Sequence, residues 1–131
     1  MSTQTLEQKR AKHALAQIKP LQSKPYKDKY AAYVKALPAA ILMNGLGQAL
    51  ATELAADDDA HHELANHLAG WLIEPELRIY TDPSSRDAKG LLDAIVAHGQ
   101  DAYVRAQGEA LAYLGWLKRF AAAFLDEKSN P

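Results

Sequence analysis

The chain has 131 residues, 48% of them hydrophobic, and a formal net charge of −1. This length and composition suit one globular domain with one core, and the lack of cysteine excludes disulfides and thiolate metal sites. No apolar run reaches the ~20 residues needed to cross a bilayer, and the opening MSTQTLEQKR lacks the apolar stretch of a signal peptide. We therefore expect one cytoplasmic domain without membrane contact over residues 1–131, with flexible tails at 1–5 and 127–131.

The charges are unevenly distributed along the chain. Residues 1–35 contain eight lysines or arginines against two acidic residues, a net charge of +6, and the remainder carries −7. A basic first segment on an acidic body favours a directional surface that could contact a polyanion. On charge alone, a solvated lysine-rich face is the more common explanation.

Helical patterns describe the whole chain, because alanine and leucine dominate and β-branched residues are scattered. A first helix is predicted over about 6–19, ahead of Pro20, and a proline-containing loop follows it. A second helix is predicted from about 27 to 44, with Leu42 in its apolar stripe. Pro38 predicts a kink or a fresh helix start within it.

The segment NGLG at residues 44–47 lies between apolar helix formers. A hairpin turn would need flanking strands, and a phosphate-binding loop would need a preceding strand and more glycines. We interpret the segment as a helix interruption, because Asn44 and Gly45 tolerate left-handed or capping conformations. A third helix is then predicted to about residue 56.

The second half of the chain continues the helical pattern. Three aspartates at 57–59 predict the cap of a fourth helix over about 60–74. Residues 77–86 are predicted to be irregular, with a short RIY strand left open. A fifth helix is predicted over about 86–98, with Val96 apolar, and a last helix, capped by Asp101, to about 126. The prediction is an all-α fold, a single compact bundle of about six helices.

The segment HHELANH resembles a metal-binding motif only superficially. The zinc-protease pattern needs two histidines four residues apart on one helix face, with a glutamate after the first. Here His62 and His67 are five apart, which turns the second ring ~140° away from the first. The aspartates at 57–59 lack the further ligands of a calcium loop. We predict surface polar residues here, with no metal, no cofactor and no catalytic site.

An aromatic stripe is predicted in the last helix. Tyr113, Trp116, Phe120 and Phe124 recur at spacings of three and four residues. Such a stripe can stack nucleic-acid bases, but it more often forms core. Lys118 and Arg119 interrupt the stripe, and their charged heads must reach water, a carboxylate or a phosphate.

Three segments of the chain resemble one protein family. KYAAYVKALPAAILMNGLGQALA is similar to the signature YxxxVxxLPxxIxxNGLGQxLA of the small subunit of type III-B CRISPR effector (Cmr) complexes. GEALAYLGWLKRFAAAFL resembles that family's closing helix, EALxYLxWLKRFA, and QKRAKHALAQI resembles its opening basic helix. The segments are collinear over nearly the full length, whereas residues 52–100 are not distinctive.

The resemblance implies a non-catalytic, all-α structural subunit that serves antiviral defence. In this family, copies stack as a minor filament beside the backbone subunits, which bind the guide RNA. The groove between the two filaments holds the duplex of guide RNA and target RNA. Target cleavage belongs to the backbone subunit and nucleotide chemistry to the large subunit, so both subunits are implied as partners.

A basic surface in such an assembly would hold phosphates while base pairing reads the sequence. Cations in the matching segments are predicted to contact the RNA backbone: Lys9, Arg10, Lys12, Lys118 and Arg119. Further contacts are predicted for Lys27, Lys29 and Lys35. Structural or interface roles are predicted for Asn44, Gly45, Gly47, Gln48 and Trp116. Packing is favoured for the two glycines, and contact of Asn44 and Gln48 with RNA or a neighbour stays open.

Two alternatives from other classes are also open. One is a protein-only helical scaffold or adaptor with no RNA contact, in which the lysines serve solubility. The other is a hydrolase using His61, His62 and His67, which a metal analysis of the purified protein would test.

Overall fold

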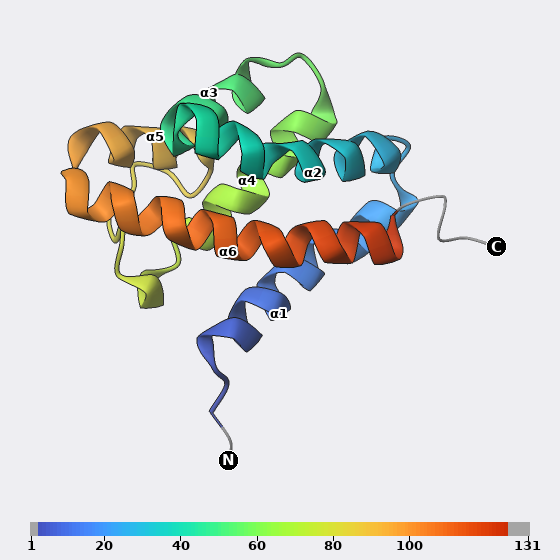
Figure 1. Cartoon of the computed structure of the whole chain (residues 1–131), viewed down its shortest axis with the longest axis horizontal. Coiled ribbons are helices and arrows are strands. Elements are labelled where there is room, and N and C mark those ends of the chain that lie inside the picture. Colours follow the sequence, from blue (N-terminus) through green and yellow to red (C-terminus); the bar gives the residue numbers. More distant parts are fainter. Residues whose placement is uncertain (1–2, 126–131) are drawn as a thin grey trace.

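The structure, a computed structural model, describes residues 3–125 and is all-α, as predicted (Figure 1). No strand occurs within this range, so the RIY strand that was left open does not form. The predicted C-terminal tail at 127–131 lies outside the described residues. Thr5, in the predicted N-terminal tail, forms a capping box with Gln8 at the start of the first helix. No helix in the described range is both long and apolar enough to span a membrane.

Six α-helices and two short 3-10 helices follow one another along the chain. The α-helices are α1 (Leu6–Ile18), α2 (Lys27–Asn44), α3 (Leu46–Ala55), α4 (Asp59–Leu72), α5 (Ala88–Ala97) and α6 (Gln100–Phe124). The 3-10 helices are η1 (Lys19–Ser23) and η2 (Pro75–Leu77).

Most predicted helix limits lie within two residues of the observed ones, and the differences have local causes. α2 runs through Pro38 as one helix, so a fresh helix start there does not occur. α5 begins after Asp87, whose side chain accepts a hydrogen bond from the Gly90 amide at 3.0 Å. The predicted cap at Asp101 is wrong, because Gly99 is the N-cap of α6 and Asp101 lies in the first turn.

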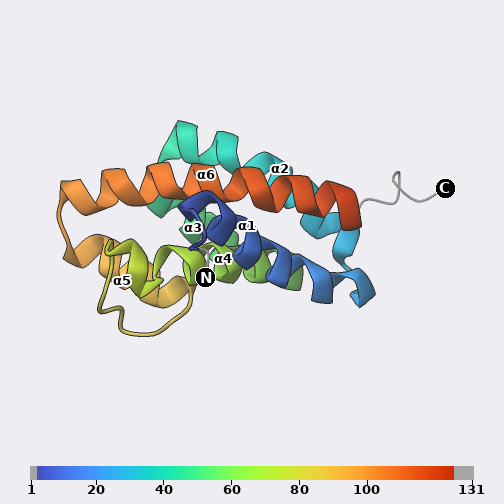
Figure 2. The ribbon, with the colours of Figure 1, turned by 90° about the horizontal axis from the view of Figure 1, so that it is seen from below.

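The long helix α6 organises the bundle. It runs along the long axis of the molecule, with α1 projecting from one side and α2 lying along the other (Figures 1 and 2). α6 packs most extensively against α1 and α2, and α4 packs against α2, α5 and α6. The buried residues of α6 recur at helical spacing: Ala106, Ala110, Tyr113, Leu114, Leu117 and Ala121. The alanines among them allow neighbouring backbones to approach closely.

Two residues of the predicted apolar stripes are not in the core. Leu42 is 69% exposed and Val96 is 83% exposed, so their inward placement is wrong. Both lie near the last turn of a helix, where the neighbouring helix no longer covers that side. The fourth helix matches its prediction better, because its apolar side chains Leu64, Leu68, Trp71 and Leu72 are all buried.

The break at NGLG is confirmed, and Gly45 makes it. Gly45 has φ 87° and ψ 157°, a region that is essentially restricted to glycine. Its amide donates to the Ile41 carbonyl at 2.7 Å, which closes α2. The first amides of α3 are bonded by side chains of α6: Leu46 N–H donates to Gln107 Oε1 at 3.1 Å, and Gly47 N–H to Tyr103 Oη at 2.9 Å.

Substituting Gly45 should therefore destabilise the fold. A Cβ at this position would lie 2.9 Å from Tyr103 Oη, and the backbone would be strained as well. We expect Gly45→Ala to lower the free energy of unfolding by about 2 kcal/mol, measured by urea denaturation followed by circular dichroism. Gly108→Ala is the matched control, because this α6 glycine faces open space and the change should stabilise the helix by up to ~1 kcal/mol. Equal stability of Gly45→Ala and the wild type would contradict the assigned backbone constraint.

Candidate functional site

The aspartates and histidines around the start of α4 serve the fold. Asp58 is the N-cap, as the aspartate run predicted: Oδ1 accepts from the His61 amide at 2.8 Å and Oδ2 from the Tyr33 hydroxyl at 2.9 Å. His67 Nδ1 lies 2.8 Å from Tyr30 Oη, and His62 Nε2 lies 2.6 Å from the Ala56 carbonyl oxygen.

The histidine environments differ from the predicted surface polar residues. The His67 side chain is only 10% exposed, so its surface placement is wrong. Its ring packs at an angle against Tyr30, with a centroid distance of 5.5 Å. In the described range 3–125, no group of three or more His, Asp or Glu side chains is arranged to hold a metal ion. Packing and helix capping account for the segment that resembled a metal motif.

A partly buried polar cluster joins α1, α4 and α6. Arg10 binds Glu109 with two hydrogen bonds, one of them 2.9 Å long from Nη2 to Oε1. Trp71 Nε1 donates to the other oxygen of the same carboxylate at 2.9 Å. Burial alone would raise the pKa of Glu109, but the hydrogen bonds from Arg10 and Trp71 and the arginine charge outweigh it. The pKa of Glu109 is therefore lowered, and the carboxylate stays charged.

This cluster changes how the predicted cations of α1 are interpreted. Arg10 is only 18% exposed in its side chain and its guanidinium is occupied by Glu109. Lys9 is paired with Glu76 at 2.8 Å across the molecule. Lys12 remains exposed, and no ion-pair partner for it lies within residues 3–125. Lys9 and Arg10 thus have carboxylate partners within the chain, whereas the side chain of Lys12 is exposed to solvent.

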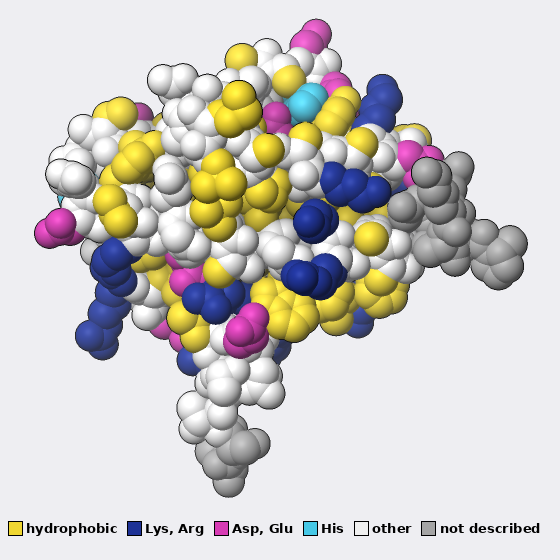
Figure 3. Space-filling model, in the orientation of Figure 1, with side chains coloured by type: hydrophobic (Ala, Val, Ile, Leu, Met, Phe, Trp, Pro, Cys, Tyr) yellow, Lys and Arg dark blue, Asp and Glu magenta, His cyan; other side chains and the backbone are white. Residues whose placement is uncertain are grey.

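The predicted cations of α6 lie on its outer side. Lys118 and Arg119 are exposed, and neither has a carboxylate partner in the described part of the chain. Arg119 Nη1 donates to the Gly115 carbonyl one turn earlier, at 3.2 Å. Lys and Arg side chains gather over and beside the C-terminal half of α6 (Figure 3). We call the surface formed by Lys118 and Arg119 the α6 basic face.

Aromatic side chains border the α6 basic face. Trp116 and Phe120 are half-buried, with ring centroids 5.6 Å apart, and Phe124 is 41% exposed at the helix end. Trp116 Nε1 donates to Glu7 Oε1 at 2.9 Å, which ties α6 to the first turn of α1. Tyr113 is fully buried. The core interpretation therefore holds for Tyr113 but not for Phe124.

The remaining predicted cations and interface residues lie on or near α2. Lys27 is half-buried, and Lys29 and Lys35 are exposed on α2. Lys29 is close enough to Asp58 for its charge to help lower the pKa of that carboxyl, although the hydrogen bond from the His61 amide is the larger cause. Asn44 and Gln48 are exposed on either side of the helix break.

Some of the partners that hold the site together carried no local signal. Tyr103 and Gln107 cap α3 from a position more than fifty residues away in sequence. Glu109 accepts the hydrogen bonds of Arg10 and Trp71 that form the polar cluster, yet in the sequence it resembles an ordinary surface glutamate of the last helix. Its spacing from Tyr113, one helical turn, is the only sequence pattern that places it near the core face.

The fold and surface define a small all-helical protein in which Glu109, Asp58 and His67 have internal partners, whereas the buried Tyr80 hydroxyl has none in the described range. The model of the family CRISPR-associated protein (Cas_Cmr5) matches residues 6–124. The CRISPR system Cmr subunit Cmr5 of Thermus thermophilus is 35% identical over 91 residues, which cover 70% of each chain. The chain therefore belongs to the Cmr5 family.

A solved structure agrees with this assignment. The crystal structure of a CRISPR-associated Cmr5 family protein from Thermus thermophilus matches with a TM-score of 0.80 and 28% identity. The match covers 95% of this chain and 100% of that one. The fold is thus common to both proteins over almost their whole length.

The buried histidine His67 predicts a dependence of stability on pH. Burial, followed by the nearby His13, lowers the pKa of His67 from 6.5 to about 4. The unfolded chain takes up this proton below about pH 6.5, whereas the folded chain does so only near pH 4. The free energy of unfolding should therefore be greatest above pH 6.5 and fall by about 3 kcal/mol as the pH drops to 4.

His67→Gln is the control, because glutamine cannot titrate but can still bond to Tyr30. His13 has a lowered pKa through burial and adds to the same trend, whereas the pKa of Glu53, raised by burial, opposes it. Urea denaturation at several pH values between 4 and 7.5 should show a shallower slope for the variant. Identical slopes would show that His67 does not titrate as its burial requires.

Proposed function

We propose that this chain is a non-catalytic small subunit of a type III-B CRISPR (Cmr) effector complex. Its copies stack in a minor filament beside the backbone subunits and the large subunit. A basic surface of the filament holds the backbone of target RNA paired with guide RNA, in antiviral defence. Membership of the Cmr5 family supports the assembly role, and the similarity to a Cmr subunit of Thermus thermophilus supports it further.

The observation that carries the RNA contact is the state of the cations on α6. Lys118 and Arg119 are exposed and have no carboxylate partner within the described residues. Lys9 and Arg10, by contrast, are neutralised by Glu76 and Glu109. Cations without partners can exchange their counterions for phosphates, which is the main source of affinity for a nucleic-acid backbone.

The α6 basic face also has features that suit an RNA strand. Partly exposed aromatic rings at Phe120 and Phe124 lie on the same half of α6, where bases can stack on them. Lys12 and the α2 lysines Lys27 and Lys35 extend the proposed surface to the flanking helices, whereas Lys29 lies among the aspartates at 57–59 and contributes less. We give Arg10 a smaller share, because its partly buried pair with Glu109 would have to break. The exposed pair of Lys9 with Glu76 is easier to break, so Lys9 is less restricted.

An isolated copy should bind RNA weakly. The chain as a whole carries a net charge of only −1, so no strong long-range field attracts a polyanion. Several copies in a filament would present their basic faces at fixed spacing, and the combined affinity would then exceed that of one copy. Weak binding alone and strong binding in the complex are both consequences of this arrangement.

A scaffold without RNA contact is the second candidate, and the exposed apolar side chains are compatible with it. Leu42, Met43 and Val104 are 69%, 82% and 60% exposed, more than a freely soluble surface requires. Such side chains suit contacts with other proteins, which both candidates include. The two candidates differ only in whether the α6 basic face touches RNA.

Charge reversal on α6 tests the RNA contact. We expect Lys118→Glu with Arg119→Glu to weaken target-RNA binding by the reconstituted complex at least tenfold, because two phosphate contacts become repulsions. The slope of log affinity against log salt should fall by about 0.7 for each lost contact. Fluorescence anisotropy with labelled target RNA, at several salt concentrations, measures both quantities.

Arg86→Glu with Lys89→Glu is the matched control, since it changes the net charge equally at exposed positions before and in α5. Circular dichroism would confirm that both double variants are folded. If the α6 variant binds RNA as tightly as the control, the scaffold without RNA contact becomes the better-supported function.

Native mass spectrometry tests the assembly role separately. The chain, mixed with the other Cmr subunits and a guide RNA, should enter the complex in several copies. Assembly of the other subunits without this chain would overturn the filament proposal, whatever the result on α6.

A further inference from the structure

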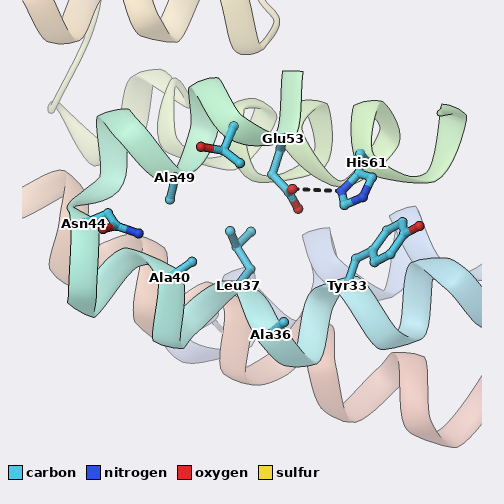
Figure 4. Close-up of a pocket in the computed structure, with 9 residues that line it drawn as sticks. Tyr33, Ala36, Leu37, Ala40, Asn44, Ala49, Glu53 and His61 are labelled. Carbon is cyan, nitrogen blue, oxygen red and sulfur yellow. Dashed lines mark hydrogen bonds and ion pairs between the residues drawn. The ribbon is translucent and has the colours of Figure 1, made fainter. Parts of the chain in front are cut away.

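A small pocket lies between α2 and α3, and none of the cations assigned to RNA lines it. Its volume is about 130 Å³. Its walls are apolar and formed by small side chains, with Ala36, Leu37 and Ala40 on α2 and Ala49 on α3 (Figure 4). The turn at Gly45 keeps the two helices side by side, so the walls are fixed by the fold.

The polar end of the pocket is formed by Glu53 and His61. Glu53 is 7% exposed and is the only buried charged residue in the described part of the chain. Its Oε2 accepts from His61 Nδ1 at 2.8 Å, and Figure 4 shows the carboxylate directed toward the space between the helices. No hydrogen bond to its other oxygen is present among residues 3–125. The pocket therefore ends at a carboxylate with an unused acceptor.

Neighbouring rings hold this carboxylate in place. The His61 ring stacks on Tyr33 with centroids 3.6 Å apart and an angle of 11° between the planes. Tyr33 in turn donates to Asp58, the cap of α4. Burial raises the pKa of Glu53, against the opposing effect of His61. The other oxygen of Glu53 is not sealed from solvent, so a donor that enters the pocket can complete its bonding.

The charges around the pocket favour a cation. Asp57, Asp58 and Asp59 line the adjoining depression, where Lys29 is the only basic side chain. With Glu53, the surface carries four carboxylates against one lysine. An RNA phosphate would be repelled here, whereas a positively charged side chain of a protein would be attracted.

We propose that the α2–α3 pocket binds an arginine side chain presented by a different protein subunit of the assembly. The alanine and leucine walls suit the methylene stem, and the guanidinium can donate to the unused oxygen of Glu53. Arginine suits this place better than lysine, because its guanidinium is more weakly hydrated and bonds carboxylates in fixed geometry. The presence of another subunit rests on the proposed function, but the arginine pocket itself does not.

The arginines of this chain itself are poor sources for the pocket. Arg10 is bound to Glu109, and Arg105 donates to the carbonyls of Leu77 and Arg78 at 2.9 and 3.0 Å. Arg119 belongs to the α6 basic face, which the proposed function assigns to RNA. A second copy could offer only the exposed residues Arg78 and Arg86 of the loop before α5. We assign the arginine to a different subunit, and the second experiment below separates this source from Arg78 or Arg86 of a second copy.

The first experiment uses the isolated full chain, so it is independent of the assembly. Nα-acetyl-L-arginine methylamide is titrated into labelled protein and followed by NMR. We expect saturable millimolar shifts at the amides of Ala40, Ala49 and Glu53. The matched citrulline compound, which has the same shape without the charge, should bind at least tenfold more weakly.

Two variants localise the binding. Glu53→Gln should weaken it at least tenfold, whereas Asp57→Asn, with the same change in charge at an exposed position, should have less than a twofold effect. Ala40→Leu fills the pocket but leaves Glu53 intact, so it should also abolish binding and covers the case in which Glu53→Gln does not fold.

NMR shifts that concentrate at residues 57–59 instead would overturn the pocket and indicate a general attraction of the arginine compound to acidic residues. Pocket shifts with cytidine or adenosine monophosphate, and none with the arginine compound, would overturn it in favour of a base site.

The second experiment identifies the source of the arginine. In the reconstituted complex, Glu53→Gln should lower the occupancy of this chain at least fivefold in native mass spectra, with Asp57→Asn as control. Reduced self-association of Glu53→Gln in sedimentation, with normal occupancy beside the other subunits, would assign the arginine to a second copy and overturn the proposed source. Full occupancy and unchanged self-association would overturn a role in assembly. Failure of the wild-type chain to enter the complex would instead overturn the proposed function, while the NMR titration would still decide the pocket.

Discussion

At Gly45 the chain turns sharply between α2 and α3. The turn places α3 back along α2, and only glycine readily adopts its backbone angles. The helix that begins there has no capping side chain of its own, so Tyr103 and Gln107 of α6 supply the missing acceptors. The local turn at Gly45 is thus linked to a tertiary contact, because the first amides of α3 are bonded by side chains of α6. The order of α2, α3 and α6 around one another follows from this single site.

Much of the fold could be predicted from local patterns, because helix formation depends on signals within a few residues. Apolar spacing, prolines and the aspartate cap placed the helices to within a few residues. The same reasoning misplaced Leu42 and Val96, since periodicity gives a direction on the helix but not whether another element lies there. Even the break at Gly45 was predictable, whereas its caps from α6 were not.

The candidate site was less predictable, because a charged side chain in a sequence carries no information about its partner. Arg10 lies in a basic run and looks like a phosphate ligand, yet Glu109 occupies it from the other end of the chain. Lys118 and Arg119, also predicted as phosphate ligands, have no such carboxylate within the described residues. Only three-dimensional packing separates these two cases. The same holds for Glu53, which has no distinguishing pattern in the sequence but is the buried acid of the α2–α3 pocket.

In the folded chain, the exposed charges are distributed differently from the charges along the sequence. The basic first segment does not form a separate basic lobe, since α1 packs on α6, Arg10 is paired with Glu109 of α6 and Lys9 is paired with Glu76 of η2. What remains is a basic surface at α6 and an acidic one at the start of α4. Exposed charges act over a Debye length of about 8 Å at physiological salt. The two surfaces can therefore attract different partners without cancelling each other. A subunit with almost no net charge can in this way hold an RNA backbone on one side and a basic protein segment on another, and its orientation in an assembly would follow from that division.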